Sequence, residues 1–239
     1  MTDLEYLEKY IDKKNLNKAI KKLKKGIPVQ YIVGNTNFYG YKINVNKNVL
    51  IPRFETEELV ENTLKYIKEY FNNEAKVLDI GTGSGCISIA LKKENVNLDI
   101  TSSDISKKAL KVAKNNAKEN NVDIKFINTN LYKGINEKFD CIISNPPYIS
   151  KDEEIMDIVY NNEPHLALFA DNNGLFFYEE ILKNIKQILK EKYLICFEIG
   201  MTQAKQIEEL ANKYLDNPKV IIKKDLSQRD RMIFIHNFE

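Results

Sequence analysis

The sequence predicts an α/β fold, in which helices cover both faces of a largely parallel β-sheet. Beyond Pro52, short apolar runs typical of buried strands alternate with longer segments that carry apolar residues at helical spacing. Glycines and short polar residues stand directly after several of these runs, where the chain must turn back. The length of 239 residues allows one full-sized core with a small appendage.

The first 52 residues differ in pattern from the rest. Residues 1–25 carry apolar side chains at helical spacing, which predicts one or two short helices that end at Gly26 and Pro28. Residues 31–51 show an extended pattern around Gly40, which predicts a β-hairpin. We therefore expect three parts, namely a short N-terminal helical segment at 1–27, a β-hairpin linker at 28–52 and a main domain at 53–239.

The main domain is predicted to alternate between helices and strands. Its expected helices are residues 56–71, 86–93, 107–120, 175–189 and 203–214. Its expected strands are residues 76–80, 98–103, 124–128, 139–144, 193–199, 220–223 and 231–235. In such sheets ligands bind beyond the carboxyl ends of the strands, so the residues that follow the strands are the candidates for function.

Composition argues against several classes of protein. The 36 basic and 34 acidic residues nearly cancel, although seven lysines gather between Lys13 and Lys25, and no stable nucleic-acid partner is expected. No membrane span or secretory signal is expected either, so we predict a cytoplasmic protein. The three cysteines, Cys86, Cys141 and Cys196, fit no metal spacing and lie in apolar runs, which predicts buried thiols and no metal site.

A glycine-rich loop, Gly81-Thr82-Gly83-Ser84-Gly85, follows the predicted strand at 76–80. Glycines there let a ligand approach the main chain closely. An ordinary tight turn is one alternative, and the dinucleotide fingerprint G-x-G-x-x-G is another. The third glycine comes one position too early for that fingerprint, and Cys86 stands in its place. The spacing therefore favours a loop that holds the methionine part of S-adenosylmethionine.

Asp104 follows the predicted strand at 98–103. A carboxylate at this place can accept hydrogen bonds from both ribose hydroxyls of a nucleoside, which fits S-adenosylmethionine and NAD alike. The alternative is that Asp104 caps the helix that starts near Ser106.

The segment Asn145-Pro146-Pro147-Tyr148 follows the predicted strand at 139–144. An amide nitrogen is a poor nucleophile, because its lone pair is delocalised into the carbonyl group. The Asn145 side-chain oxygen and the Pro146 backbone carbonyl can accept its two N–H groups, and Tyr148 can pack on the planar target. The two prolines hold these acceptors rigidly, so catalysis by positioning needs no strong base.

With these motifs, the chain resembles the HemK/PrmC family of protein-glutamine N-methyltransferases. The resemblance runs from about Pro28 to Phe234. Besides the glycine loop and Asn145 to Tyr148, it rests on Pro28-Val29-Gln30-Tyr31-Ile32, Phe38-Tyr39-Gly40, Leu50-Ile51-Pro52-Arg53-Phe54-Glu55-Thr56-Glu57, Glu163-Pro164-His165-Leu166-Ala167-Leu168, Phe197-Glu198-Ile199-Gly200 and Lys224-Asp225-Leu226.

The resemblance implies a class I S-adenosylmethionine-dependent methyltransferase with a Rossmann-like, seven-stranded, mostly parallel sheet. Its substrate would be the glutamine side-chain nitrogen (N5) in the Gly-Gly-Gln motif of peptide-chain release factors, the proteins of translation termination. The residues implied to bind S-adenosyl-L-methionine are Gly81, Thr82, Gly83, Ser84, Gly85, Asp104, Asn130, Leu131 and Asn145. The residues implied to hold the glutamine are Asn145, Pro146, Pro147 and Tyr148, with Asn145, Pro146 and Tyr148 as the catalytic ones.

Two features depart from the family pattern. Asn130 stands where the family usually has Asp, at a position that faces the adenine amino group. Only about 25 residues precede the shared segment, where the family usually has a longer helical domain. Three alternatives stay open: an adenine-N6 DNA methyltransferase that flips its base into the pocket, a methyltransferase of another translation protein or RNA, and a non-catalytic ribosome-associated factor.

Overall fold

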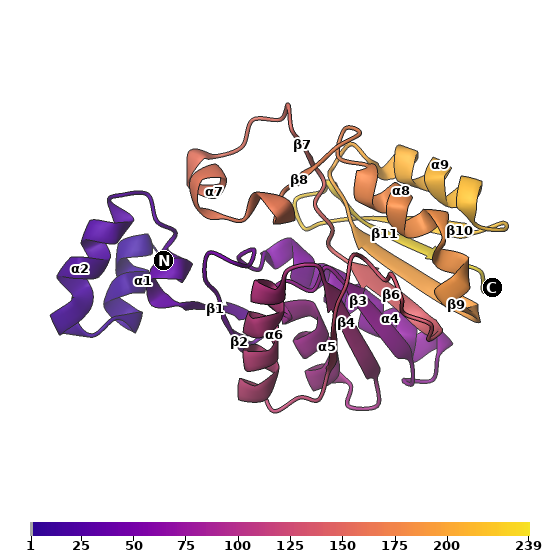
Figure 1. Cartoon of the computed structure of the whole chain (residues 1–239), viewed down its shortest axis with the longest axis horizontal. Coiled ribbons are helices and arrows are strands. Elements are labelled where there is room, and N and C mark those ends of the chain that lie inside the picture. The colour runs from indigo at the N-terminus through magenta and orange to yellow at the C-terminus, as the bar shows by residue number, and fades with distance from the viewer. Residues whose placement is uncertain (1) are drawn as a thin grey trace.

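The computed structural model describes residues 2–239, and its centre is a seven-stranded sheet (Figure 1). The strand order is β10-β11-β9-β6-β3-β4-β5. The strands are β3 (Lys76–Ile80), β4 (Asp99–Asp104), β5 (Lys125–Asn128), β6 (Phe139–Ser144), β9 (Leu189–Glu198), β10 (Lys219–Lys224) and β11 (Asp230–His236). Neighbours pair in parallel, except that β11 runs antiparallel to both β9 and β10. The predicted fold class is confirmed.

Helices cover both faces of this sheet. Three pack on one face, α4 (Phe54–Tyr70), α5 (Cys86–Glu94) and α6 (Lys107–Glu119), and two on the other, α8 (Phe176–Lys183) and α9 (Ala204–Tyr214). Because side chains alternate along a strand, Val77 joins the first core and Leu78 the second. All three cysteines are buried and unpaired, as predicted.

The order of the strands reverses at β3. The chain runs from β3 outward through β4 and β5, then returns to the opposite side of β3 as β6. The connections on either side of β3 therefore leave in opposite directions, and a crevice opens between the carboxyl ends of β3 and β6. The glycine loop and Asn145 follow these two strands, so the topology brings them to one edge of the sheet.

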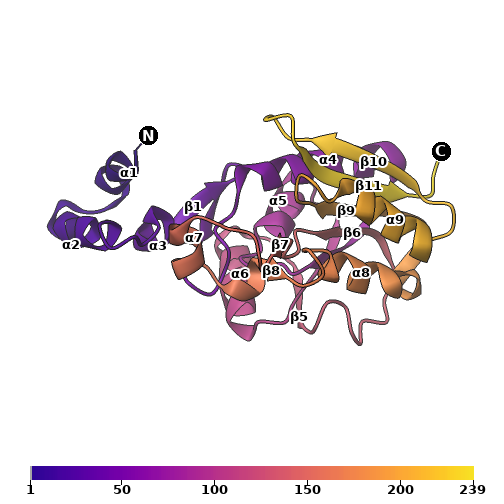
Figure 2. The same ribbon diagram turned by 90° about the horizontal axis from the view of Figure 1, so that it is seen from above.

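The N-terminal elements form a small core of their own at one end of the molecule (Figures 1 and 2). They are α1 (Asp3–Tyr10), α2 (Lys13–Leu23) and α3 (Val29–Val33), followed by a hairpin of β1 (Asn35–Phe38) and β2 (Tyr41–Asn44). The hairpin buries Phe38 and Ile43 in the core under α4 to α6. Asn116 of α6 fastens it, because its side chain exchanges two hydrogen bonds with the Asn44 backbone and donates a third to the Ser84 carbonyl.

Two predicted elements were wrong in part. Residues 31–51 were expected to be extended, but the hairpin spans only 35–44: residues 31–33 belong to α3, in which Ile32 N donates to the Pro28 carbonyl and Gly34 ends the helix at φ 90°. After β2 the chain turns, with Val49 N donating to the Asn46 carbonyl. The expected helix at 175–189 is shorter: α8 ends at Lys183, a 3-10 turn spans Ile185–Ile188, and β9 begins at Leu189. Ile185 and Ile188 are buried in the 3-10 turn, and their spacing would also bury them in a continuous helix. The apolar spacing therefore did not predict the break at Asn184.

The segment between β6 and α8, in which the sequence predicts no helix or strand, forms a cover over the carboxyl edge of the sheet. It contains β7 (Ile149–Ser150), α7 (Asp157–Asn162), a 3-10 turn (His165–Ala167) and β8 (Phe169–Ala170). Its side chains line both cavities described below. Within residues 2–239, no helix combines the length and the apolar character that a bilayer crossing needs.

Candidate active site

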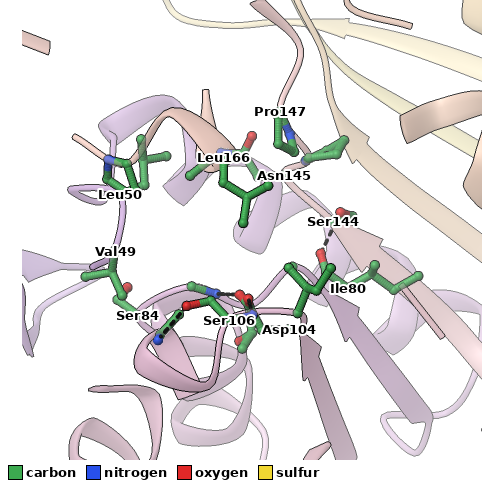
Figure 3. A pocket seen from close by; sticks show the side chains of 18 of the residues that line it. Val49, Leu50, Ile80, Ser84, Asp104, Ser106, Ser144, Asn145, Pro147 and Leu166 are labelled. Atoms are coloured by element: carbon green, nitrogen blue, oxygen red, sulfur yellow. Dashed lines mark hydrogen bonds between the residues drawn. The ribbon is translucent and has the colours of Figure 1, made fainter. Parts of the chain in front are cut away.

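A cavity of about 330 Å³ lies at the carboxyl ends of β3, β4 and β6. Ten of the predicted site residues line it: Gly81, Thr82, Gly83, Ser84, Asp104, Asn130, Leu131, Asn145, Pro146 and Pro147. Figure 3 shows Leu166 and Asn145 on one side of this cavity and Asp104 and Ser106 across it. Two predicted residues, Gly85 and Tyr148, do not line this cavity.

The glycine loop is shaped by backbone conformations that favour glycine. Gly81, Gly83 and Gly85 have φ values of 75°, 56° and 83°. A Cβ on Gly85 would lie 3.1 Å from the Ala113 Cβ, so this glycine lets α6 pack closely against the loop. Gly85 therefore has a packing role in the structure, whereas Gly81 and Gly83 present backbone to the cavity.

Asp104 fastens the loop to the next strand. Its Oδ2 accepts a hydrogen bond from Gly83 N at 2.9 Å, and its Oδ1 accepts one from Ser106 N at 2.8 Å. The cap of α6 is Ser106, whose side chain accepts from Ala109 N, so capping is not the task of Asp104. Each carboxylate oxygen has room for a further donor, as a ribose hydroxyl would require.

The charges beside the loop suit a cationic ligand. Asp79 is fully buried; its Oδ2 accepts from the Thr82 and Ser88 hydroxyls, while its Oδ1 has no partner among the described residues. Burial raises the pKa of Asp79 to about 6, with a smaller contribution from the charge of Asp104, and burial also raises the pKa of Asp104. A positive charge in the cavity would stabilise the ionised form of both carboxylates. The site therefore fits the sulfonium and ammonium groups of S-adenosylmethionine.

A second cavity of about 330 Å³ adjoins the first. Four residues line both, namely Leu50, Arg53, Asn145 and Ala167. Its lining includes the apolar side chains of Ile155, Met156 and Val159 and the polar side chains of Tyr148, Glu154 and Glu198. Tyr148 thus faces this second cavity, next to Asn145.

Asn145 is held by a chain of hydrogen bonds from buried side chains. Its Nδ2 donates to Thr56 Oγ1 at 3.2 Å, and Thr56 Oγ1 donates to Glu198 Oε2 at 2.6 Å. The Tyr148 hydroxyl lies 3.4 Å from Glu198 Oε1. Glu198 is 1% exposed, and burial raises its pKa to about 7.

Glu163 is hydrogen-bonded to Arg53, which lines both cavities. Its Oε1 pairs with Arg53 at 2.6 Å, and its Oε2 accepts from Ile51 N at 3.1 Å. Glu163 is 5% exposed, so these charge-assisted bonds are sheltered from water. They join the segment before α4, which contributes Leu50 and Arg53 to the lining of both cavities, to the cover segment.

The backbone of Tyr148 is braced from behind. Gln203 Nε2 donates to the Tyr148 carbonyl at 2.9 Å and to the Asn173 carbonyl at 3.2 Å, while Gln203 Oε1 accepts from Gly200 N. Gly174 passes directly beneath with a φ of 81°. A Cβ on Gly174 would lie 2.0 Å from the Tyr148 carbonyl oxygen, so only glycine fits.

Sequence reasoning assigned no role to the residues that support the site: Arg53, Thr56, Glu163, Gly174, Glu198 and Gln203. Four of them stand in segments that carry the family resemblance. Glu198 also had a local signal, since it is a charged residue at the end of an otherwise apolar strand. A buried charge in that position needs partners.

Comparison with known proteins places this site in context. Residues 54–166 match the model of the methyltransferase small domain. A release factor glutamine methyltransferase of Streptococcus pneumoniae is 43% identical over 211 residues, which cover 87% of this chain and 74% of that protein. One of Flavobacterium psychrophilum is 44% identical over 220 residues, covering 90% and 77%.

Solved structures share the fold at low sequence identity. A methyltransferase from Pyrococcus furiosus superposes with a TM-score of 0.61 and 17% identity, over 83% of this chain and 90% of that one. These values show that the fold is shared, and a shared fold does not by itself identify the substrate.

Proposed function

This chain belongs to the release factor glutamine methyltransferases, and from that premise we propose that it methylates the side-chain amide nitrogen of a glutamine in a peptide-chain release factor. S-adenosylmethionine is its cofactor, and when bound it supplies a methyl group on a positively charged sulfur. We further propose that this glutamine is the one in the Gly-Gly-Gln motif of the release factor.

One observation carries the proposal: Asn145 stands where the two cavities meet and lines both. The cavity at the glycine loop suits the cofactor, by the lining and charges described above. The apolar side chains that line the second cavity suit the aliphatic stem of a glutamine, and Asn145, one of its polar lining residues, suits the amide. A nitrogen held at Asn145 would therefore face the methyl group.

The residues of the chain act by holding this amide. Asn145 Oδ1 is left free by the bond of its Nδ2 to Thr56, and it accepts one N–H. The Pro146 carbonyl accepts the other, and Tyr148 packs on the amide plane. Two acceptors draw electron density toward the nitrogen and orient its lone pair for in-line attack. The nitrogen gains the methyl group and loses one proton to solvent.

The test is methyl transfer from labelled cofactor to three acceptors side by side: a purified release factor, a Gly-Gly-Gln peptide and duplex DNA. We expect label on the release factor and on the glutamine of the peptide. Label on DNA alone would instead support adenine methylation, which places a flipped base in the same pocket. No transfer to any acceptor would favour a non-catalytic role.

Asn130 tests the cofactor side of the proposal. It lines the first cavity, and if it accepts a hydrogen bond from the adenine amino group, Asn130→Asp is expected to tighten S-adenosylmethionine by about three- to tenfold, because hydrogen bonds to charged groups contribute more than neutral ones. Calorimetry measures both dissociation constants. Asn212→Asp on α9 adds the same charge outside the cavity and serves as the control. Unchanged or weaker binding by Asn130→Asp would exclude this role for the residue.

Removal of the N-terminal segment tests how the release factor is recognised. We propose that residues 1–27 help to hold the release factor, with 28–52 as a linker and 53–239 as the methyltransferase domain. Leu7 and Ala19 of this segment share a small core with Val29 of α3, outside both cavities, and the lysines of the segment can add only a salt-sensitive attraction. Deleting residues 1–25 is therefore expected to leave methylation of a short peptide nearly intact while weakening use of the whole release factor.

The measurement is the ratio of kcat/KM on protein and peptide, before and after truncation, in low and moderate salt. Equal losses on both substrates would show that the segment stabilises the fold of the enzyme. No loss on either would make it dispensable for recognition.

A further inference from the structure

The amide of Asn145 has two possible orientations, which differ by exchange of its oxygen and its NH2 group. Only one presents an acceptor to a substrate N–H. The backbone and the two prolines place the Asn145 side chain but do not choose between these orientations. The choice must come from what the far side of the amide contacts, and that contact is the Thr56 hydroxyl.

The charge of Glu198 decides which group donates in the hydrogen bond between Thr56 and Asn145. An ionised Glu198 can only accept hydrogen bonds, and the Thr56 hydroxyl has a single hydrogen. Thr56 donates that hydrogen to Glu198 over 2.6 Å, so its oxygen is left to accept from Asn145. The Asn145 NH2 group must then face Thr56, over 3.2 Å, and its oxygen faces the cavity.

We propose that Thr56 and Glu198 are positioning residues, which hold the Asn145 amide with its oxygen toward the nitrogen that receives the methyl group. The proposal rests on the proposed function and deepens it. It also accounts for substrate class: an acceptor held in this way binds the NH2 of a glutamine, whereas the carboxylate of a glutamate has no hydrogen to donate.

Other charged and titratable groups around Glu198 do not change this logic. They are Glu55 of α4, Tyr148 after β6, Cys86 of α5, Tyr178 of α8 and Arg231 of β11. Arg231 is itself paired with Asp225 at 3.2 Å, and its charge lowers the pKa of Glu198, although burial dominates. Tyr178 donates to the Glu198 backbone carbonyl and leaves the carboxylate to Thr56 and Tyr148.

A protonated Glu198 would no longer fix which group donates in the hydrogen bonds of Thr56. A protonated carboxyl can donate to Thr56, and the Thr56 hydrogen is then free to bond to the Asn145 oxygen. The Asn145 NH2 group would face the substrate NH2, and two donors would meet. With a Glu198 pKa of about 7, kcat/KM is expected to fall about tenfold between about pH 8 and about pH 6.

Thr56 is the first residue to vary, because Glu198 lines the second cavity and could also affect the substrate directly. Thr56→Val keeps the size and removes the hydroxyl, and we expect kcat/KM to fall about 10- to 100-fold through loss of orientation. Thr56→Ser restores the hydroxyl and is expected to stay within about threefold of the wild type. Thr63→Val is the matched control: Thr63 is equally buried on α4, but its hydroxyl bonds only to the Leu59 carbonyl.

Binding of S-adenosylmethionine is measured in each variant, since Thr56 also borders the first cavity. A loss in Thr56→Val that is matched by Thr63→Val, or that is fully explained by weaker cofactor binding, would overturn the proposal. A kcat/KM of Thr56→Val within threefold of the wild type would also overturn the proposal. The expected pattern is a large loss in Thr56→Val, rescue by Thr56→Ser and unchanged cofactor affinity.

Glu198→Gln tests the pH dependence. The glutamine can both donate and accept, so the orientation is no longer enforced; we expect lower kcat/KM and loss of the fall below about pH 7. Asp79, whose pKa is about 6, is present in both proteins, so the difference between the two profiles isolates Glu198. A variant that keeps the wild-type slope would contradict the proposal.

A measurement without turnover separates this inference from the proposed function. The side-chain NH2 signals of Asn145 in nitrogen-15 NMR are expected to shift with an apparent pKa of about 7 in the wild type and to lose this step in Glu198→Gln. If the wild type does not methylate a release factor, the proposed function fails while this titration still tests the orientation. If methylation is present but the titration is absent, only the positioning proposal fails.

Discussion

Replacing Asn145 by alanine is expected to lower kcat/KM for methyl transfer about 100- to 1,000-fold, because one oriented acceptor in the transition state is lost. The cavity lining that remains, with the glycine loop and Asp104, should keep cofactor affinity close to that of the wild type. The loss should therefore appear in the chemical step, as a fall in kcat at saturating cofactor.

The measurement combines single-turnover methyl transfer with calorimetry of S-adenosylmethionine. Asn62→Ala is a suitable control, because Asn62 is a partly buried asparagine on α4 that lines neither cavity. Activity within threefold of the wild type for Asn145→Ala would contradict the two-acceptor mechanism. A loss of cofactor binding as large as the loss of activity would instead assign Asn145 to the cofactor alone.

Gly174→Ala is expected to have the second large effect, although Gly174 lines neither cavity. Its Cβ would lie 2.0 Å from the Tyr148 carbonyl oxygen and 2.4 Å from Gln203 Nε2, so the backbone of Tyr148 and the turn at Gly174 cannot both keep their positions. A displacement of about 1 Å at a positioning element can cost about 100-fold in rate, and we expect kcat/KM to fall by that order. Strain at φ 81° adds about 1 to 3 kcal/mol of destabilisation.

The two effects can be separated with Gly134→Ala. Gly134 has a similar φ of 78°, but a Cβ there would meet nothing within 4 Å. This control should lower the melting temperature through backbone strain and leave methyl transfer nearly unchanged. Gln203→Ala removes the brace without a clash and is expected to give an intermediate loss of activity. If Gly174→Ala and Gly134→Ala behave alike, the position of Tyr148 does not depend on this contact.

Most of the fold followed from local patterns. The strand at 76–80 was predicted with the bounds that β3 has, because five apolar-rich residues end at a glycine. The break between α8 and β9 was not predictable, because the buried spacing of Ile185 and Ile188 suits a helix and a 3-10 turn alike. The elements of the cover segment after β6 were not predicted, because they are only two to six residues long and so show no clear periodicity.

The site divides in the same way. Local patterns were enough to show which residues stand at the carboxyl ends of the strands, namely the glycine loop, Asp104 and Asn145 to Tyr148, because each follows its strand directly along the chain. The same patterns indicated that these residues lie together, since parallel strands end at one edge of a sheet. A ligand cavity there was foreseeable from these facts alone.

The contacts that hold these residues in place join segments that are far apart in the sequence. Thr56 and Glu198 are 142 positions apart, and Arg53 and Glu163 are 110 apart, yet each pair shares a hydrogen bond. Periodicity reports whether a side chain is buried, but it carries no information about which distant segment lies opposite. Burial is also what raises the pKa of Glu198, and the direction of its bond to Thr56 sets the orientation of Asn145. Such properties arise from contacts between segments, so they exist only in the folded chain.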